Sequence, residues 1–559
     1  MGTQRAARQA VAVAVAVLLI GACSGGDDDS GAGSTVAPTP PAVSEASPPP
    51  SDATPPPSDA TPPSSAVESL PSTPEADDRL YGGDVVYSIG TEMNTLDPLG
   101  VAAGTSGNNR AIQIFETLFR VDPDGNLAPS LALSMDSDDG ATWTIKLRPG
   151  VNFSDGTPLD ADAVVYNIDR QRNAPDTFVF KGNVENITSV EAIDLETVEI
   201  TLSEPSGSFP FTFTSVNGLM ASPTAVEADP EGFGDNPVGA GPFLLDEWVR
   251  DDHMTLVRNP DYWDAPRPYL DSITVRILPQ QQSWIDTILS GESHIVAARP
   301  DVIAATRNEP EIQYAALSPV GGEFVTVNQQ WEPGSDKRLR EAIALAFDPA
   351  IVEEVFTRGA WPSQELVCPP FLPGSPECLE GVWPKPDPAR AAELIQEWLA
   401  DGNSPDVELL STSSVAALNE FLQQTLNGIG LNVSINAGAT ADYAANINAG
   451  NYQLAWGALP AFDNPYPRVF QQFASTGGRW LGRADLPELD DALARGRDAL
   501  SADDRAAAYQ DFQRIVAEEF IVGWFAPFVT GLAVRNVDVG SQGPGVDYHM
   551  VDFSLIEPE

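Results

Sequence analysis

Basic residues are scarce in this chain. Only 30 lysines and arginines stand against 80 aspartates and glutamates among 559 residues, and the formal net charge is −50. Proteins that bind nucleic acid neutralise phosphates with basic patches, so this composition excludes general nucleic-acid binding. It also argues against docking on anionic lipid by charge, and the acidity favours solubility. With 42% hydrophobic residues, the chain can bury large cores and has the length of two or three domains.

Histidine is equally scarce, which bears on metals and catalysis. His253, His294 and His549 are far apart in sequence and show no ligand spacing, so we expect no metal site and no cofactor. Gly-x-Ser-x-Gly and His-Glu-x-x-His are absent, and the glycine-rich turn at Val238–Phe243 lacks the Lys-Ser/Thr ending of a phosphate-binding loop. We therefore expect a protein that is not an enzyme. A tethered hydrolase remains an alternative, since acidic residues could supply a carboxylate pair.

The amino terminus has the pattern of an export signal. Arg5 and Arg8 precede an apolar run, Ala10–Ile20, that is too short to span a bilayer. Ile20-Gly-Ala-Cys23 resembles a bacterial lipobox, which predicts cleavage before Cys23 and a lipid anchor on that residue. The alternative is an ordinary secretory signal with a chance cysteine. The lipobox places the protein on the outer face of a bacterial cell membrane.

A long polar segment follows the lipobox. Residues 24–78 contain no basic residue and are rich in proline, serine, threonine and aspartate. The sequence Pro-Pro-Pro-Ser-Asp-Ala-Thr occurs twice in tandem, at 48–54 and 55–61. No apolar period exists from which a core could form, so we expect a disordered tether, stiffened by proline, that lifts the folded part from the membrane.

The remaining two cysteines bracket a short loop. Cys368 and Cys378 flank a Pro-Pro-Phe-Leu-Pro-Gly sequence. In an exported protein this spacing favours a disulfide, whereas a metal pair is the competing interpretation and no histidine lies near.

Apolar spacing predicts the elements of an α/β fold. Thr142–Leu147 alternates as a half-buried strand, and Asp160 stands where the N-cap of the next helix belongs. We expect further helices at Asn108–Phe119 and Ala499–Phe520. Strand, helix and strand alternate over 407–435, which predicts a parallel sheet with flanking helices.

Three motifs carry a resemblance to a known family. The first, Leu147–Arg170, contains Leu-Arg, a turn, Asp-Gly-Thr-Pro and a capped helix. The second, Val238–Phe243, is a glycine-rich turn. The third, Val257–Trp263, has the sequence Val-Arg-Asn-Pro-Asp-Tyr-Trp. Together they resemble the family 5 extracellular solute-binding proteins, the dipeptide-, oligopeptide- and nickel-binding group of ABC importers. Such matches run from about Gly83 to Val534 and cover most of the chain after the tether.

The resemblance implies a type II periplasmic-binding-protein fold, with two α/β lobes joined by hinge strands and an extra subdomain in the first lobe. The expected division of the chain is signal peptide and lipobox at 1–23, tether at 24–78, first lobe at 79–320, subdomain at about 114–236, second lobe at 321–529 and a return to the first lobe at 530–559.

The implied function is capture of a solute, a peptide by default, between closing lobes, and delivery to an ABC permease with its ATPase subunits. We expect a monomer. A cell-surface peptide or signal receptor without transport is one alternative. A non-peptide solute, such as an oligosaccharide, is another.

The expected ligand site centres on the loop after Trp456. In peptide receptors of the family, an aspartate three residues after the equivalent tryptophan holds the peptide ammonium, and here that position is Leu459. Asp463 is the remaining carboxylate of the loop and has two interpretations, a replacement partner or the cap of the Asn464-Pro465 turn. The other candidate ligand contacts are Ala458 beside them, Thr105 from the first lobe, and Glu323 and Arg358 from the second.

Overall fold

The computed structural model divides the chain into two units, Met1–Glu75 and Ala76–Glu559. It describes residues 81–100, 106–122, 126–175, 178, 180–319, 321–356, 366–371, 373–459, 466, 468–477, 479–527, 529–540 and 552–558. Cys23 and the tether therefore lie outside the described residues. Within them, no helix is long and apolar enough to cross a membrane.

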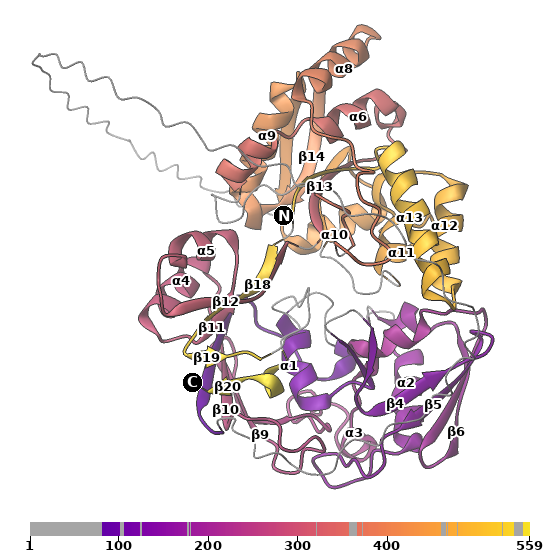
Figure 1. Cartoon of the computed structure of the whole chain (residues 1–559), viewed down its shortest axis with the longest axis vertical. Helices are drawn as coiled ribbons and strands as arrows, with labels where there is room; N and C mark the ends of the chain where they lie inside the picture. Colours follow the sequence, from indigo (N-terminus) through magenta and orange to yellow (C-terminus); the bar gives the residue numbers. More distant parts are fainter. Residues whose placement is uncertain are drawn as a thin grey trace, which may run out of the picture. The chain divides into compact units, whose positions relative to one another are not determined.

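A seven-stranded mixed sheet forms the base of what we call the first lobe (Figure 1). The order is β12 (Ile312–Pro319), β18 (Val529–Arg535), β11 (Ile295–Ala297), β1 (Asp84–Ile89), β10 (Ser272–Ile277), β9 (His253–Arg258) and β8 (Phe243–Val249). Strand β1 runs parallel to β10 and β11, and the outer pairs are antiparallel. The helices of this part of the chain are α1 (Ser106–Phe115), α2 (Ala161–Arg172), α3 (Pro223–Ala228), α4 (Gln281–Ser290) and α5 (Pro300–Thr306).

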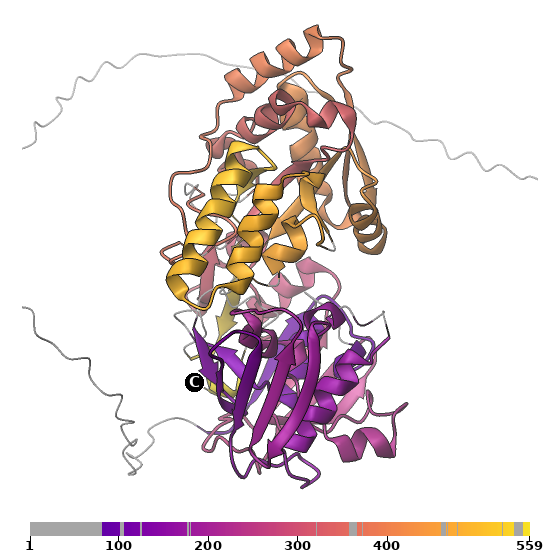
Figure 2. The same ribbon diagram turned by 90° about the vertical axis from the view of Figure 1, so that its right-hand side faces the viewer.

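A separate antiparallel sheet lies within the sequence of the first lobe. Its order is β4 (Ala132–Asp136), β5 (Thr142–Leu147), β7 (Thr197–Leu202) and β6 (Ile187–Asp194), and helix α2 packs on it. The short pairs are β2 (Phe119–Val121) with β3 (Leu127–Pro129), and β19 (Val537–Asp538) with β20 (Glu557–Pro558). Figure 2 shows the antiparallel sheet from its broad side.

The second lobe is built on a five-stranded sheet. Its order is β15 (Asn432–Gly438), β14 (Asp406–Thr412), β16 (Leu454–Leu459), β13 (Gly322–Val327) and β17 (Val522–Ala526). Strand β14 is parallel to both neighbours, whereas β13 is antiparallel to β16 and β17. The helices are α6 (Lys337–Leu345), α7 (Pro349–Ile351), α8 (Pro388–Ala400), α9 (Ala416–Gly428), α10 (Thr440–Ala449), α11 (Arg468–Phe473), α12 (Pro487–Asp498) and α13 (Ala502–Glu518).

The chain crosses twice between the two large sheets. Strand β12 ends at 319 in the first sheet, and β13 begins at 322 in the second. Strand β17 ends at 526 in the second sheet, and β18 begins at 529 in the first. Two short connections side by side are the geometry of a hinge.

Two local predictions are confirmed and two are wrong. Asp160 caps α2 by accepting from the Ala163 N–H at 3.1 Å, and β5 buries alternate residues as expected. The helix expected to run to Phe119 ends at Phe115, because Glu116 adopts a left-handed φ of 60° and Phe119 begins strand β2. The helix expected from Ala499 begins at Ala502 after its Ser501 cap, and α12 precedes it.

Candidate functional site

The site is built at the end of the second-lobe sheet that adjoins the hinge. Strands β13 and β16 pair antiparallel, with Glu323 opposite Ala458 and Val325 opposite Trp456. Glu323 and Trp456 are therefore diagonal neighbours on one face of the sheet, within reach of long side chains. The indole Nε1 of Trp456 donates a hydrogen bond to Oε2 of Glu323 at 2.7 Å. The structure thus brings together two of the residues expected from sequence.

Glu323 carries a carboxyl group that is almost withdrawn from water. The residue is 9% exposed, and burial raises the pKa of its carboxyl to about 7. The hydrogen bond from Trp456 and the positive charge of Arg299 lower this pKa and only partly offset the effect of burial. Among the residues that the structure describes, Oε1 accepts no hydrogen bond. A carboxylate in this state gains a great deal from a cation placed beside it.

Trp456 is itself positioned by its neighbours. The Tyr443 hydroxyl donates to the Trp456 carbonyl at 2.5 Å, and the two rings lie 6.3 Å apart. Burial raises the pKa of Tyr443 to about 12, so this donor keeps its proton at every ordinary pH. The indole therefore presents its N–H to Glu323 from a fixed strand position.

Leu459 lies on the other face of β16. It is 3% exposed and belongs to a hydrophobic core with Phe324 and Cys368, whereas Ala458 shares the face of Glu323 and Trp456. The position at which the family resemblance implies an acidic residue is therefore part of the core in this chain.

Three of the expected ligand residues, Thr105, Arg358 and Asp463, lie outside the described residues. Sequence reasoning also missed two contributors to this site. Arg299 follows the buried strand β11, and Tyr443 lies on α10. Neither carries a sequence signal of its own, because each reaches the site only through the pairing of distant elements.

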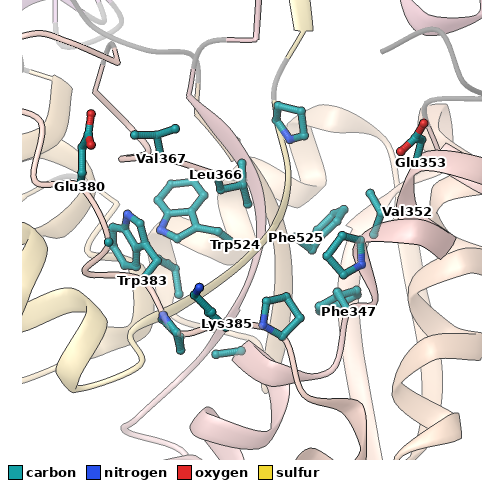
Figure 3. Close-up of a pocket in the computed structure, with 17 residues that line it drawn as sticks. Phe347, Val352, Glu353, Leu366, Val367, Glu380, Trp383, Lys385, Trp524 and Phe525 are labelled. Carbon is teal, nitrogen blue, oxygen red and sulfur yellow. The ribbon is translucent and has the colours of Figure 1, made fainter. Parts of the chain in front are cut away.

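A cavity of about 740 Å³ opens beside β17, the edge strand next to β13. Figure 3 shows Trp383, Trp524, Phe525 and Phe347 as a row of aromatic side chains in its wall. Cavities of roughly 300–1,000 Å³ with mostly apolar walls are typical of small-molecule sites.

A disulfide joins the two flanks of one cavity wall. Cys368 and Cys378 are bonded with their Cα atoms 5.4 Å apart. Cavity-lining residues lie directly before the first cysteine, at Val367, and two residues after the second, at Glu380. Within the described part of the chain, no group of three or more His, Cys, Asp or Glu side chains could hold a metal ion.

Comparisons with known proteins agree with this architecture. The model of the bacterial extracellular solute-binding proteins, family 5 middle region, matches residues 126–480. The glutathione-binding protein GsiB of Escherichia coli K12 is 31% identical over 370 residues, which are 65% of this chain and 71% of that protein. The GsiB protein of Salmonella paratyphi A is 32% identical over 388 residues, covering 68% and 75% respectively.

Solved structures show the same fold. DppA of Helicobacter pylori, in complex with the peptide STSA, superposes with a TM-score of 0.74 at 23% identity, over 86% of this chain and 99% of that one. AppA of Bacillus subtilis, in complex with a nonapeptide, gives 0.69 at 18% identity over 86% and 100%. The expectation of an α/β type II binding-protein fold is thereby confirmed.

Proposed function

Since this chain belongs to family 5 of the bacterial extracellular solute-binding proteins, we propose that its solute is a peptide whose ammonium group is held by Glu323. Proteins of this family are binding proteins that deliver their ligand to an ABC transporter. The observation that carries the proposal is the buried Glu323 carboxylate, whose Oε2 is occupied by Trp456 while Oε1 accepts no hydrogen bond from a described residue.

The electrostatics favour a cationic ligand group. An ammonium beside Glu323 would lower the pKa of this carboxyl from about 7 and restore the ionised form, opposing the effect of burial. Relatives of this chain are named for binding glutathione or are solved with bound peptides, which supports a peptide as the ligand.

The test compares free and blocked peptides. Calorimetry at pH 7.5 with residues 79–559 should show binding of Ala-Ala-Ala, and N-acetylation should weaken it by about 100-fold, because one partner of a buried charge pair is lost. Glu323→Gln should reduce the affinity for the free peptide to that of the acetylated one. Glu332→Gln, an exposed acid in the same lobe, is the control and should change nothing. Equal affinity for both peptides would refute the role of Glu323.

Capture would proceed by closure of the lobes about the two crossings at 319–322 and 526–529. We place the first lobe at 79–320, the second at 321–529 and the returning segment at 530–559. The loaded monomer would then dock on a separate permease with its ATPase subunits. A receptor without transport would bind the same peptides, and loss of peptide uptake on deletion of the gene distinguishes import from sensing.

We also propose that a lipid on Cys23 anchors the protein to the membrane. Cleavage before Cys23 would leave a lipid-modified cysteine followed by the tether of residues 24–78, so the protein would sit on the outer face of the cell membrane. Cys23→Ser should release the protein from the membrane fraction into the medium. Retention of this variant in the membrane would refute the anchor.

A further inference from the structure

We propose that the cavity beside β17 is an apolar subsite of the same solute site and receives a bulky aromatic or branched side chain of the peptide. The inference rests on the proposed function. It extends the ligand from a cationic group at Glu323 to an apolar group one strand away.

The register of β13 against β17 relates the position of Glu323 to the cavity. Glu323 pairs with Ala526, whereas its neighbour Phe324 pairs with Trp524, so Phe525 is an extra residue in β17. Such a bulge bends the strand and re-aims the side chains beside it. Phe525 and Ala526 both belong to the core on the Val325 face, which is also the face of Glu323. Phe525 and Pro527, which flank the pairing partner of Glu323, both line the cavity, so the cavity lies along the strand next to the one that carries Glu323.

The cavity walls suit an apolar ring. Phe347 stacks on Phe525 with ring centroids 4.8 Å apart, and Trp383 meets Trp524 edge to face at 5.9 Å. Gly322 permits this arrangement, since a Cβ at that position would lie 2.6 Å from the Trp524 ring. Aromatic groups pack favourably against such walls in offset or edge-on geometry.

Two polar groups in the wall remain unpaired. Trp524 is 8% exposed, and neither its indole N–H nor that of Trp383 has a hydrogen-bond acceptor among the described residues. Buried donors without acceptors cost free energy. A peptide carbonyl that enters beside the apolar side chain would supply an acceptor, which a pure hydrocarbon ligand would not.

The disulfide-bonded wall is held in place before any ligand binds. Arg505 of α13 forms an ion pair with Glu377 at 2.9 Å, and Gln513 bonds the Glu377 carbonyl at 2.5 Å. Together with the Cys368–Cys378 disulfide, these contacts fix the segment that carries Trp383. A preformed cavity binds more tightly than one that must be ordered by the ligand.

Charges stand at the rim. Glu380 and Glu353 lie at the two ends of the aromatic row, and Lys385 lies near its middle (Figure 3). With two acids against one base, the rim disfavours an acidic side chain. The apolar walls and the acidic rim together therefore select bulky residues that carry no acid.

The test compares two peptides that differ only in one side chain, Ala-Ala-Ala and Ala-Phe-Ala, by calorimetry at pH 7.5. Ala-Phe-Ala should bind at least about 10-fold more tightly, as expected for one buried aromatic side chain. Trp383→Ala should reduce this preference to about 3-fold or less. Trp331→Ala removes a part-buried tryptophan of the same lobe outside the cavity and should keep the preference.

A second variant tests the subsite independently, in case Trp383→Ala does not fold. Leu366→Trp fills the cavity from its half-buried wall and should reject Ala-Phe-Ala while it still binds Ala-Ala-Ala. Two results would overturn the subsite. Wild type could show no preference for Ala-Phe-Ala, or wild type and both variants, Trp383→Ala and Leu366→Trp, could show the same preference. Acetylated peptides that keep the Trp383-dependent preference without loss of affinity would refute the role of Glu323 and leave the subsite standing. Dependence on the free amine without a Phe preference would refute the subsite alone.

Discussion

Gly207 lies at a close contact between the two lobes. It lies between β7 and the following short helix in the first lobe, and a Cβ built on it would lie 1.8 Å from the carbonyl oxygen of Ala499 in the second lobe. The nearest atoms to that Cβ all belong to Ala499 and Leu500. Gly207→Ala should therefore strain the contact between lobes without strain inside either one.

The size of the effect follows from the contacts beside Gly207. The Ser208 N–H donates to the Arg497 carbonyl at 3.3 Å, and the Ser206 hydroxyl donates to the same oxygen at 3.4 Å. Each bond contributes about 1 kcal/mol, so forcing the lobes apart here would remove about 2 kcal/mol from the arrangement in which these contacts form. If solute capture needs that arrangement, the affinity falls by about 30-fold.

Calorimetry with Ala-Phe-Ala measures this loss, and the radius of gyration from solution X-ray scattering with saturating peptide should show a more open molecule. Gly182→Ala is the matched control, because no atom lies within 4 Å of its added Cβ. The melting point of the ligand-free protein should be nearly the same in both variants. Wild-type affinity in Gly207→Ala would refute the argument that these contacts belong to the ligand-holding state.

Three further predictions concern the site and its support. Because the Glu323 carboxyl has a pKa of about 7 and must be ionised to hold an ammonium, peptide affinity should fall about 20-fold from pH 7.5 to 5.5, and titrations of Glu323→Gln should be flat. Leu459→Asp buries an unpaired carboxylate in the core, and denaturant unfolding should show a loss of about 3 kcal/mol without tighter peptide binding; tighter binding would contradict the placement of this residue. Replacing Cys368 and Cys378 by serine should lower the free energy of unfolding by about 2–3 kcal/mol, as expected for opening a short loop, whereas an unchanged midpoint would show that α13 alone holds the segment.

Features that depend on neighbours in sequence were predictable from the chain. The Asp160 cap and the alternation in β5 require only residues a few positions apart, and both are present. The helix end at Phe115 was not predictable in this way, since apolar spacing continues to Phe119. Tertiary pairing ends the helix at Phe115, because the chain leaves the helical conformation at Glu116 and Thr117 forms a β-bridge with Leu219.

The candidate site shows the same division. The sequence indicates Trp456 through its motif, and it indicates Glu323 only as a charged residue, with Arg358, near the mouth of an expected cleft. Their hydrogen bond joins residues 133 positions apart and depends on the register of β13 against β16. A shift of one residue would turn Glu323 to the opposite face, which no local pattern fixes.

If Glu323 holds the ammonium as proposed, its placement relative to Leu459 would account for the loss of the acidic residue that the family resemblance implies. Leu459 faces the core with Phe324, where a charge would have no partner, so the strand end of β16 cannot present a carboxylate to a ligand. In the proposed site, Glu323 would present one from the adjacent strand, on the opposite face, one residue from the position that pairs with Leu459. A carboxylate on β13 is also one strand nearer to β17 and its aromatic cavity than a carboxylate at position 459 of β16 would be. Under this reasoning, the substitution that seems to remove peptide recognition relocates it and couples it to an apolar side chain.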